Sequence, residues 1–370
     1  MTQHFLRIAS LASLLGLGAS VSGQAQTTTE DKIAVYEKQI QALQNQIDQL
    51  KKDVAELHTS SQKPTPSPRA QVFGFLQSQF ESTSPQETHR FLMRRVRLGV
   101  RGQLEKDIAY ELQADLASSS NILRNAWIDY TGLRGGAGTP FFRFGQFKLP
   151  YSAEAIDSGA ATPFVERAIV VDQLAFNHDR DTGIGLFSKP DAERPYGYAL
   201  ALVNGNGRNQ FVASPNKLVV ARLQLNTPKS HPVLGGTVAV GFATRQGHVA
   251  NFTLPIDQQI EDERYEVDFD YQSKLWRLRG EYLWGRNQAL KPSGYYSFLS
   301  YRPGAAWEAL FRYEEYTSGS QGPSVHRTTL GVSYLFSKNT KGMLNYEFVD
   351  GNAPNNQGSG LRLRLQTLFP

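Results

Sequence analysis

The sequence predicts an all-β protein, a transmembrane barrel of sixteen antiparallel strands preceded by a short N-terminal coiled-coil helix. Three observations lead to this fold class. Apolar and polar residues alternate with a period of two from Ala70 onward, as they do along strands that bury one face. The alternating segments are about ten residues long, which suits a tilted membrane strand better than a soluble sheet. Tyr, Phe and Trp recur near the segment ends, where membrane barrels carry aromatic girdles.

Residues 1–25 are predicted to be a secretory signal peptide. Arg7 supplies the positive start, an apolar run extends from Ile8 to about Val21, and small residues favour cleavage after Ala25. The alternative is a frayed N-terminal helix. Export and the absence of Cys both fit an outer-membrane protein of a Gram-negative bacterium.

Residues 26–58 are predicted to form a periplasmic coiled coil. Apolar residues recur at alternating spacings of three and four, which is the heptad of a left-handed coiled coil. The seam consists of Ile33, Tyr36, Ile40, Leu43, Ile47, Leu50, Val54 and Leu57. The alternative is an amphipathic helix that lies on its own domain, but the stripe is narrow for that. We therefore expect an oligomer, and Ile at one seam position with Leu at the other favours two strands.

Residues 59–69 contain three alternate prolines and are predicted to be a semi-rigid extended linker. The barrel then occupies residues 70–370. The predicted strands are 70–80, 91–103, 107–117, 122–132, 139–147, 181–188, 196–204, 217–226, 234–244, 260–272, 274–285, 294–301, 305–316, 325–336, 340–350 and 360–369. The longer connections, expected outside the cell, are 81–90, 148–180, 205–216, 245–259, 317–324 and 351–359.

No enzyme motif is present in the sequence. The serines lack a Gly-x-Ser-x-Gly setting, there is no phosphate-binding Gly-x-x-x-x-Gly-Lys loop, and the seven His residues show no ligand spacing. Without Cys there is also no thiolate metal site. We expect no enzymatic activity, no cofactor and no metal, which makes an outer-membrane lipase or protease the weakest alternative.

Arginine is the residue type that carries the functional prediction. Residues 70–370 hold 23 Arg and 9 Lys against 28 Asp and Glu, and sixteen strands leave an aqueous channel. Many Arg share the polar strand face, where planar guanidinium groups suit phosphate and carboxylate oxygens. The candidate anion pathway is Arg95, Arg97, Arg101, Arg143, Arg222, Arg277, Arg279, Arg312, Arg327, Arg362 and Arg364.

Two alternatives stay open at this point. The lumen arginines can pair with carboxylates on the same face rather than face passing anions. Those carboxylates are Glu111, Asp115, Glu266, Asp268, Asp270, Glu281 and Glu347. The phase of the alternation places Arg94 on the lipid side, from which its side chain would extend to the membrane interface.

The segment 148–180 is too long for a simple barrel connection. A loop of this length can fold into the channel and narrow it. Lys148 and Arg167 are then the constriction candidates, with Arg143 just inside the preceding strand. The alternative is an exposed surface loop.

Five motifs resemble the phosphate-selective porin O/P family over residues 70–370. They are RRVRLGVRG at 94–102, AWIDY at 126–130, RFGQFKLP at 143–150, FVERA at 164–168 and ALVNGNG at 201–207. The resemblance implies a trimeric barrel of sixteen strands, an infolded third loop and an arginine ladder that leads anions to a basic constriction. Arg95, Arg97 and Arg101 look like part of such a ladder, and Arg143 and Lys148 sit in the matching stretch.

The expected function is passive diffusion of small anions, phosphate among them, across the outer membrane. The expected partners are these anions, outer-membrane lipid and two further copies of the chain, with no nucleic acid. We side with a trimer, because three adjacent barrels can enforce three strands in the coiled coil. The alternatives are a porin without phosphate selectivity and a barrel that anchors a coiled coil to tether the cell envelope.

Overall fold

A computed structural model describes residues 29–61, 70–85, 87–120, 122–133, 139–175, 179–190, 194–210, 216–227, 236–250, 259–287, 290–319, 322–352 and 357–369. The chain divides into two units, residues 1–67 and 68–370, and each is described by itself. The predicted signal peptide and residues 62–69 of the predicted linker lie outside the described residues.

The described part of the first unit is the helix α1, which runs from Thr29 to Ser61. The seam side chains from Ile33 to Leu50 are all at least half exposed in the single chain. The side chains of Val54 and Leu57 lie outside the described residues. The predicted helix is confirmed, and its assembly into a coiled coil stays a prediction. Among the described residues, no helix combines the length and the apolar character that a membrane span needs.

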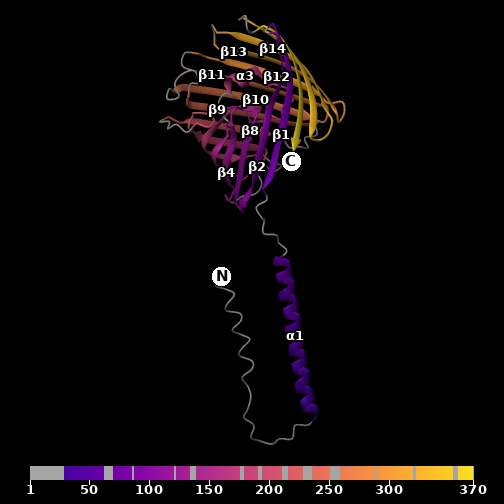
Figure 1. Cartoon of the computed structure of the whole chain (residues 1–370). Coiled ribbons are helices and arrows are strands. Elements are labelled where there is room, and N and C mark those ends of the chain that lie inside the picture. The colour runs from indigo at the N-terminus through magenta and orange to yellow at the C-terminus, as the bar shows by residue number, and fades with distance from the viewer. Residues whose placement is uncertain are drawn as a thin grey trace. The chain divides into compact units, whose positions relative to one another are not determined.

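The second unit is a closed barrel of sixteen antiparallel strands, as predicted, in which β1 pairs with β16 (Figure 1). The strands are β1 Gln71–Ser84, β2 Thr88–Glu105, β3 Ile108–Asp115, β4 Leu123–Tyr130, β5 Phe141–Lys148, β6 Arg180–Ser188, β7 Tyr196–Val203, β8 Leu218–Asn226, β9 Gly236–Ala250, β10 Gln259–Ser273, β11 Trp276–Arg286, β12 Ser293–Tyr301, β13 Trp307–Thr317, β14 Ser324–Leu335, β15 Thr340–Gly351 and β16 Gly358–Phe369. Every strand pairs with both neighbours, so no edge is left open, as the bilayer interior requires.

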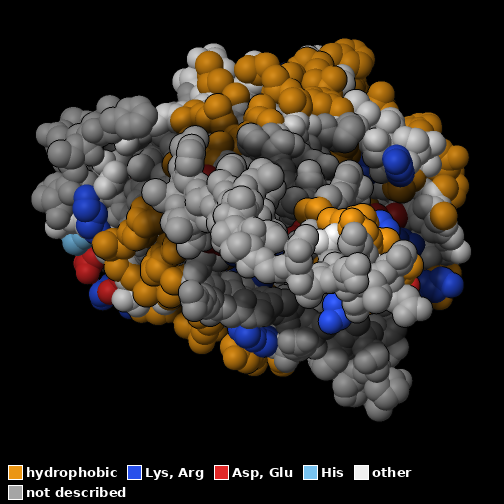
Figure 2. Space-filling view, turned by 90° about the horizontal axis from the view of Figure 1, so that it is seen from below, with side chains coloured by type: hydrophobic (Ala, Val, Ile, Leu, Met, Phe, Trp, Pro, Cys, Tyr) orange, Lys and Arg blue, Asp and Glu red, His pale blue; other side chains and the backbone are white. Residues whose placement is uncertain are grey.

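The period-two pattern places apolar side chains outside and polar side chains inside. On β16, Leu361, Leu363 and Leu365 are exposed, whereas Arg364 and Gln366 are buried. Figure 2, seen from below, shows patches of hydrophobic side chains around the periphery of the view, with scattered basic side chains near its edge. This arrangement is inside-out relative to a soluble protein, because lipid rather than water surrounds the sheet.

Some predicted boundaries were wrong. β1 and β2 continue as a paired hairpin up to Thr83 opposite Thr88, where a long loop over 81–90 was expected. β9 likewise runs to Ala250 rather than ending at 244. The boundaries were predicted from apolar alternation, which stops where a strand leaves the lipid. Backbone pairing between strands continues beyond that point in water, with polar side chains such as Glu81 opposite Arg90.

The described part of the connection between β5 and β6, residues 149–175, lies among the inward-facing side chains of the barrel. It contains α2, Ala153–Ile156, and α3, Ile169–Leu174, and α3 contacts β11, β12 and β13 (Figure 1). Phe164 and Val170 are fully buried in a cluster that includes Leu283 and Phe298 of the strands. The Phe164 and Phe298 rings meet edge to face at 5.5 Å. This buried apolar cluster holds the segment inside the barrel rather than on its surface.

Candidate functional site

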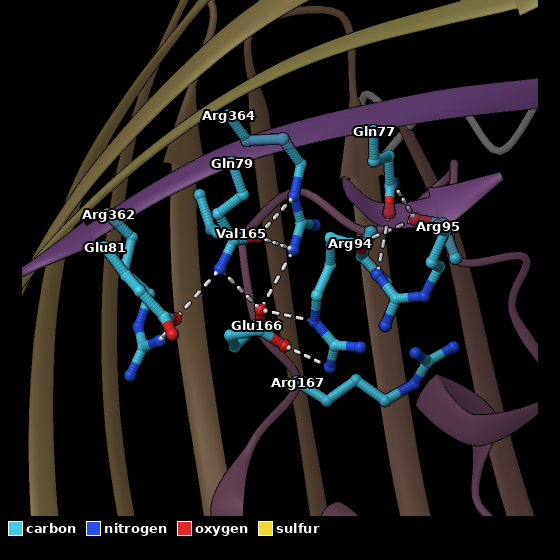
Figure 3. Close-up of polar contacts among 12 residues, drawn as sticks. Gln77, Gln79, Glu81, Arg94, Arg95, Val165, Glu166, Arg167, Arg362 and Arg364 are labelled. Atoms are coloured by element: carbon cyan, nitrogen blue, oxygen red, sulfur yellow. Dashed lines mark hydrogen bonds and ion pairs between the residues drawn. The ribbon is translucent and has the colours of Figure 1, made fainter. Parts of the chain in front are cut away.

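Glu166, in the infolded segment, is held by a group of side chains that we call the Glu166 clamp: Arg94, Gln79 and Arg364 (Figure 3). Arg94 donates from Nε to Oε1 at 3.1 Å and from Nη2 to Oε2 at 3.0 Å. Arg364 Nη2 and Gln79 Nε2 each donate to Oε1 at 3.0 Å. The clamp therefore joins the segment to β1, β2 and β16 at once.

The position of Arg94 corrects the prediction that this side chain faces lipid. The β1–β2 register shifts between Gln77, which lies opposite Arg95, and Ser78, which lies opposite Met93. Arg94 is the extra residue of this β-bulge. A bulge breaks the alternation, so two consecutive arginines can turn to the same face of the sheet.

The arginines keep the Glu166 carboxylate ionised. Burial by itself raises the pKa of Glu166, but the charges of Arg94 and Arg364 and the Arg94 hydrogen bonds hold that pKa well below its usual range. Arg95 and Arg167 lie in the same part of the close-up (Figure 3). Arg95 donates to Gln77 Oε1 at 2.7 Å, and Arg167 donates to the carbonyl oxygen of Asp157 at 3.0 Å.

The opposite end of the segment is anchored on Glu281 of β11. The Glu281 carboxylate accepts hydrogen bonds from Ser152 Oγ and Tyr296 Oη at 2.6 Å each, and from the backbone N–H of Glu154 at 2.5 Å. The Glu154 carboxylate in turn accepts from the N–H of Ala168 at 3.0 Å. Burial raises the pKa of Glu154 to about 7, although Arg312 and Arg167 lie close enough to oppose the rise.

Lys148, at the end of β5, does not pair with a carboxylate in the described part of the chain. Its ammonium donates to the carbonyl oxygens of Ala155 and Ile156 at 2.8 Å each, and to that of Asp157 at 2.5 Å. Together with Arg167 it satisfies the last carbonyl groups of α2, which a helix leaves without internal partners. Carbonyl groups carry no formal charge, so the positive charge of Lys148 is not neutralised by these bonds.

Most of the other predicted pathway arginines are paired with carboxylates inside the barrel. The closest pairs are Arg97–Asp115 at 3.1 Å, Arg143–Asp129 at 2.7 Å, Arg222–Asp268 at 2.6 Å, Arg277–Asp270 at 2.6 Å, Arg279–Asp157 at 2.6 Å, Arg312–Glu314 at 3.0 Å, Arg327–Glu314 at 2.6 Å and Arg362–Glu81 at 2.8 Å. Arg101 instead donates to Gln71 Oε1 at 3.0 Å.

Sequence reasoning missed several buried lumen arginines. Arg245 and Arg264 share Asp262, at 2.7 Å and 3.2 Å, and Arg180 pairs with Asp179. Arg264 could have been found, because it continues the polar phase of its predicted strand. Arg245 and Arg180 lie in segments that were predicted to be connections. The alternation along strands therefore could not assign their side chains to the inner face.

Two neighbouring cavities remain open in the barrel. The large cavity has a volume of about 710 Å³ and lies on the inner face of β2–β8. The charged residues among its described lining are the cations Arg101, Arg143, Lys148, Lys189 and Arg222 and the acids Glu111 and Asp129. The small cavity, of about 150 Å³, has a balanced set: Arg222, Arg277 and Arg279 with Asp157, Asp268 and Asp270.

The geometry, a closed sixteen-stranded barrel with a polar interior, can be compared with known proteins. The model of one family, Phosphate-selective porin O and P, matches residues 73–222. The chain is an outer-membrane porin. The match runs from β1 into β8, covers less than half of the chain, and includes all five motifs on which the resemblance rests. The resemblance is thereby confirmed over residues 73–222 of the 70–370 for which it was predicted, and with it the class of channel rather than enzyme.

Solved porins share the fold of this porin. An anion-selective porin from Comamonas acidovorans is 13% identical, with a TM-score of 0.61, covering 82% of this chain and 100% of that chain. OmpT of Vibrio cholerae in its trimer form is 11% identical, with a TM-score of 0.60 and coverage of 82% and 100%. OmpF of Salmonella typhi, in complex with daunomycin, is 14% identical, with a TM-score of 0.61 and coverage of 82% and 98%. No curated protein matches the chain.

Proposed function

We propose that this porin is a passive channel that favours anions, phosphate among them. The observation that carries the proposal is the charge of the large cavity, whose described lining residues include five cationic and two acidic side chains. Basic groups at the wall of a cleft raise the local concentration of anions. Their N–H donors replace part of the hydration shell, and several weak sites in sequence let the anion leave.

The infolded segment 148–180 narrows the lumen in this proposal. Support comes from its contacts with two separate groups of strands: the Glu166 clamp on β1, β2 and β16, and Glu281 on β11. Lys148 then contributes positive charge beside the narrowed passage, because it lines the large cavity, as does the Arg143–Asp129 pair. Arg167 acts by fixing the segment, through its bond to the Asp157 carbonyl group.

The many ion pairs argue for a moderate anion preference rather than strict phosphate selectivity. A guanidinium already paired with a carboxylate contributes little net field at the pore axis. Arg95 and Arg101 form their described side-chain hydrogen bonds with glutamines, and Lys148 with carbonyl groups. These three, rather than the whole set of predicted pathway residues, supply unbalanced charge.

The test is the reversal potential of single channels in a KCl gradient. We expect a potential of the sign that marks chloride as the more permeant ion. Addition of phosphate should then reduce the chloride current, and its effect should saturate. Cation preference would overturn the proposal, whereas anion preference without phosphate block would leave a general anion porin.

A second role, as an anchor that tethers the cell envelope, is favoured by one observation. The seam of α1 is exposed in the single chain, with Tyr36 and Leu50 each 62% exposed, so this apolar row needs partners. We propose a trimeric periplasmic coiled coil, and the trimer form of the similarly folded Vibrio cholerae OmpT is consistent with that state. Deletion of residues 26–69 should leave conductance intact, and lost envelope attachment in that variant would establish tethering.

A further inference from the structure

We propose that the large cavity contains a subsite for a small organic anion that carries an aromatic ring, of which an aromatic carboxylate is the simplest case. The proposal names a substrate class for the proposed anion channel and rests on that function. It begins from the wall of the cavity. Beside its cations this wall holds the aromatic side chains of Trp127, Phe141 and Phe187.

These three rings surround one guanidinium group. The Cζ atom of Arg143 lies 3.7 Å from the ring centroid of Trp127, 5.5 Å from that of Phe141 and 5.3 Å from that of Phe187. Phe141 and Phe187 stack on each other, with centroids 5.6 Å apart and an interplanar angle of 21°. The rings lie on the inner face of β4, β5 and β6, so they cannot belong to the aromatic girdle in contact with lipid.

The orientation of the guanidinium is fixed by a neighbouring carboxylate. Asp129 lies directly opposite Arg143 in the β4–β5 register and accepts from its Nε at 2.7 Å and its Nη2 at 2.8 Å. This fork uses two of the five N–H groups of the arginine. The Arg143–Asp129 pair thus positions a flat cationic surface against Trp127 without occupying the whole donor set.

An inorganic anion makes no use of such a wall. Phosphate and chloride have no apolar surface and are repelled by the negative face of an aromatic ring, whereas an aromatic ligand gains apolar contact with the parts of Trp127, Phe141 and Phe187 that line the cavity. Pro150 and Ile156 of the infolded segment add further apolar surface to the same cavity. Mostly apolar walls with a few convergent polar groups are typical of sites for organic ligands.

The charged part of the ligand has its own partners in the same cavity. Arg101 and Lys189 are exposed and Arg222 also lines the space, so a carboxylate can face these cations while its ring lies against Trp127. A volume of about 710 Å³ lies within the usual range for small-molecule sites and far exceeds the need of a single phosphate ion.

Benzoate and acetate test the proposal, because they carry the same charged group and differ by the ring. We would measure the binding of each to the purified full-length porin in detergent by titration calorimetry, and their block of chloride current in bilayers. Benzoate is expected to bind about tenfold more tightly than acetate, the size of effect that ring stacking with burial gives. Trp127→Leu should remove most of this preference, and Trp127→Phe should retain it.

The matched control is Trp307→Leu, because Trp307 is 54% exposed on the outer face of β13. This variant should bind both anions as the unaltered porin does. Equal affinities for benzoate and acetate in the unaltered porin, or a preference that survives Trp127→Leu, would overturn the subsite. If Trp127→Leu does not fold, the unaltered porin and Phe187→Leu still decide the matter.

Failure of the subsite can be told apart from failure of the anion channel. A porin that shows anion preference in the KCl gradient but binds benzoate no better than acetate keeps its proposed function and lacks the subsite. A cation-preferring porin loses the proposed function, and the calorimetric comparison of the two carboxylates still reports on the ring subsite.

Discussion

The large and the small cavity are lined by the same types of charged residue but differ in their balance of charge. They share Ile156, Arg222 and Gln224, yet the large cavity has an excess of cations and the small cavity has equal numbers of arginines and aspartates. The count of arginines on the lumen face therefore does not determine the field in the pore. What determines it is whether each guanidinium meets a carboxylate.

Cross-strand register explains the difference. In the small cavity, Asp270 of β10 lies directly opposite Arg279 of β11, so acid and base face each other along the hairpin. At Arg222 the opposite residues are Ala199 of β7 and Ala243 of β9. Arg222 therefore pairs with Glu266 and Asp268 of β10, across β9. Among the described residues, the wall between β5 and β8 therefore holds few acidic side chains, which explains the excess of cations in the large cavity.

The largest predicted effect is expected at Glu281, which anchors the infolded segment to β11. Glu281→Ala removes the acceptor of Ser152, Tyr296 and the Glu154 backbone N–H, and one of the carboxylates beside Arg279. Loss of a buried partner of this kind costs on the order of 3 kcal/mol in the free energy of unfolding. Guanidinium unfolding of the porin in detergent micelles would measure it.

The control for this experiment is Glu105→Ala, because Glu105 is exposed at the end of β2. That variant should unfold at the same guanidinium concentration as the unaltered porin. We also expect Glu281→Ala to give noisier, larger single-channel currents, since the infolded segment loses its attachment to β11. Unchanged stability together with unchanged current would show that Glu281 does not anchor the segment.

A smaller effect is expected at Glu154, on α2, which borders the small cavity. Its folded pKa of about 7 lies above the unfolded value of about 4.5, because burial disfavours the charged form. The protonated acid thus favours the fold, and stability is highest below pH 4.5 and falls as pH rises to 7. Glu154→Gln should equal the unaltered porin at pH 4 and exceed it at pH 8 by on the order of 1 kcal/mol.

Glu166→Gln is the matched variant with the opposite sign. The lowered pKa of Glu166 means that its ionised form stabilises the fold above the unfolded pKa, and that this contribution is lost in acid. Glu166→Gln should therefore unfold more easily than the unaltered porin at pH 7. Thermal unfolding of both variants at several pH values measures the two effects, and a shift of the same sign in both would contradict the assignment.

Periodicity predicted the barrel well because the lipid boundary acts on every strand in the same way. The sixteen strands and the inner face of Arg364 follow from it, whereas the inward segment after β5 was predicted from the length of the connection. Arg94 shows where it fails, since one bulged residue reverses the phase and no local signal marks a bulge. The sequence could not predict which carboxylate each lumen arginine pairs with. Arg279, for example, pairs with Asp157, which is far away in the chain and is brought close by the packing of the infolded segment.

The smallest predicted effect tests the comparison of the cavities most directly. Arg101→Gln removes a cation of the large cavity, and its described side-chain hydrogen bond is to Gln71. The double variant Arg277→Gln with Asp270→Asn removes a complete pair from the small cavity and leaves the net charge unchanged. In about 0.1 M KCl, where screening acts over about 10 Å, Arg101→Gln should lower the anion-to-cation permeability ratio about twofold. The pair variant should leave the ratio unaltered. Equal changes in both would mean that paired arginines attract anions as strongly as unpaired ones, and the distinction between the cavities would then have no functional consequence.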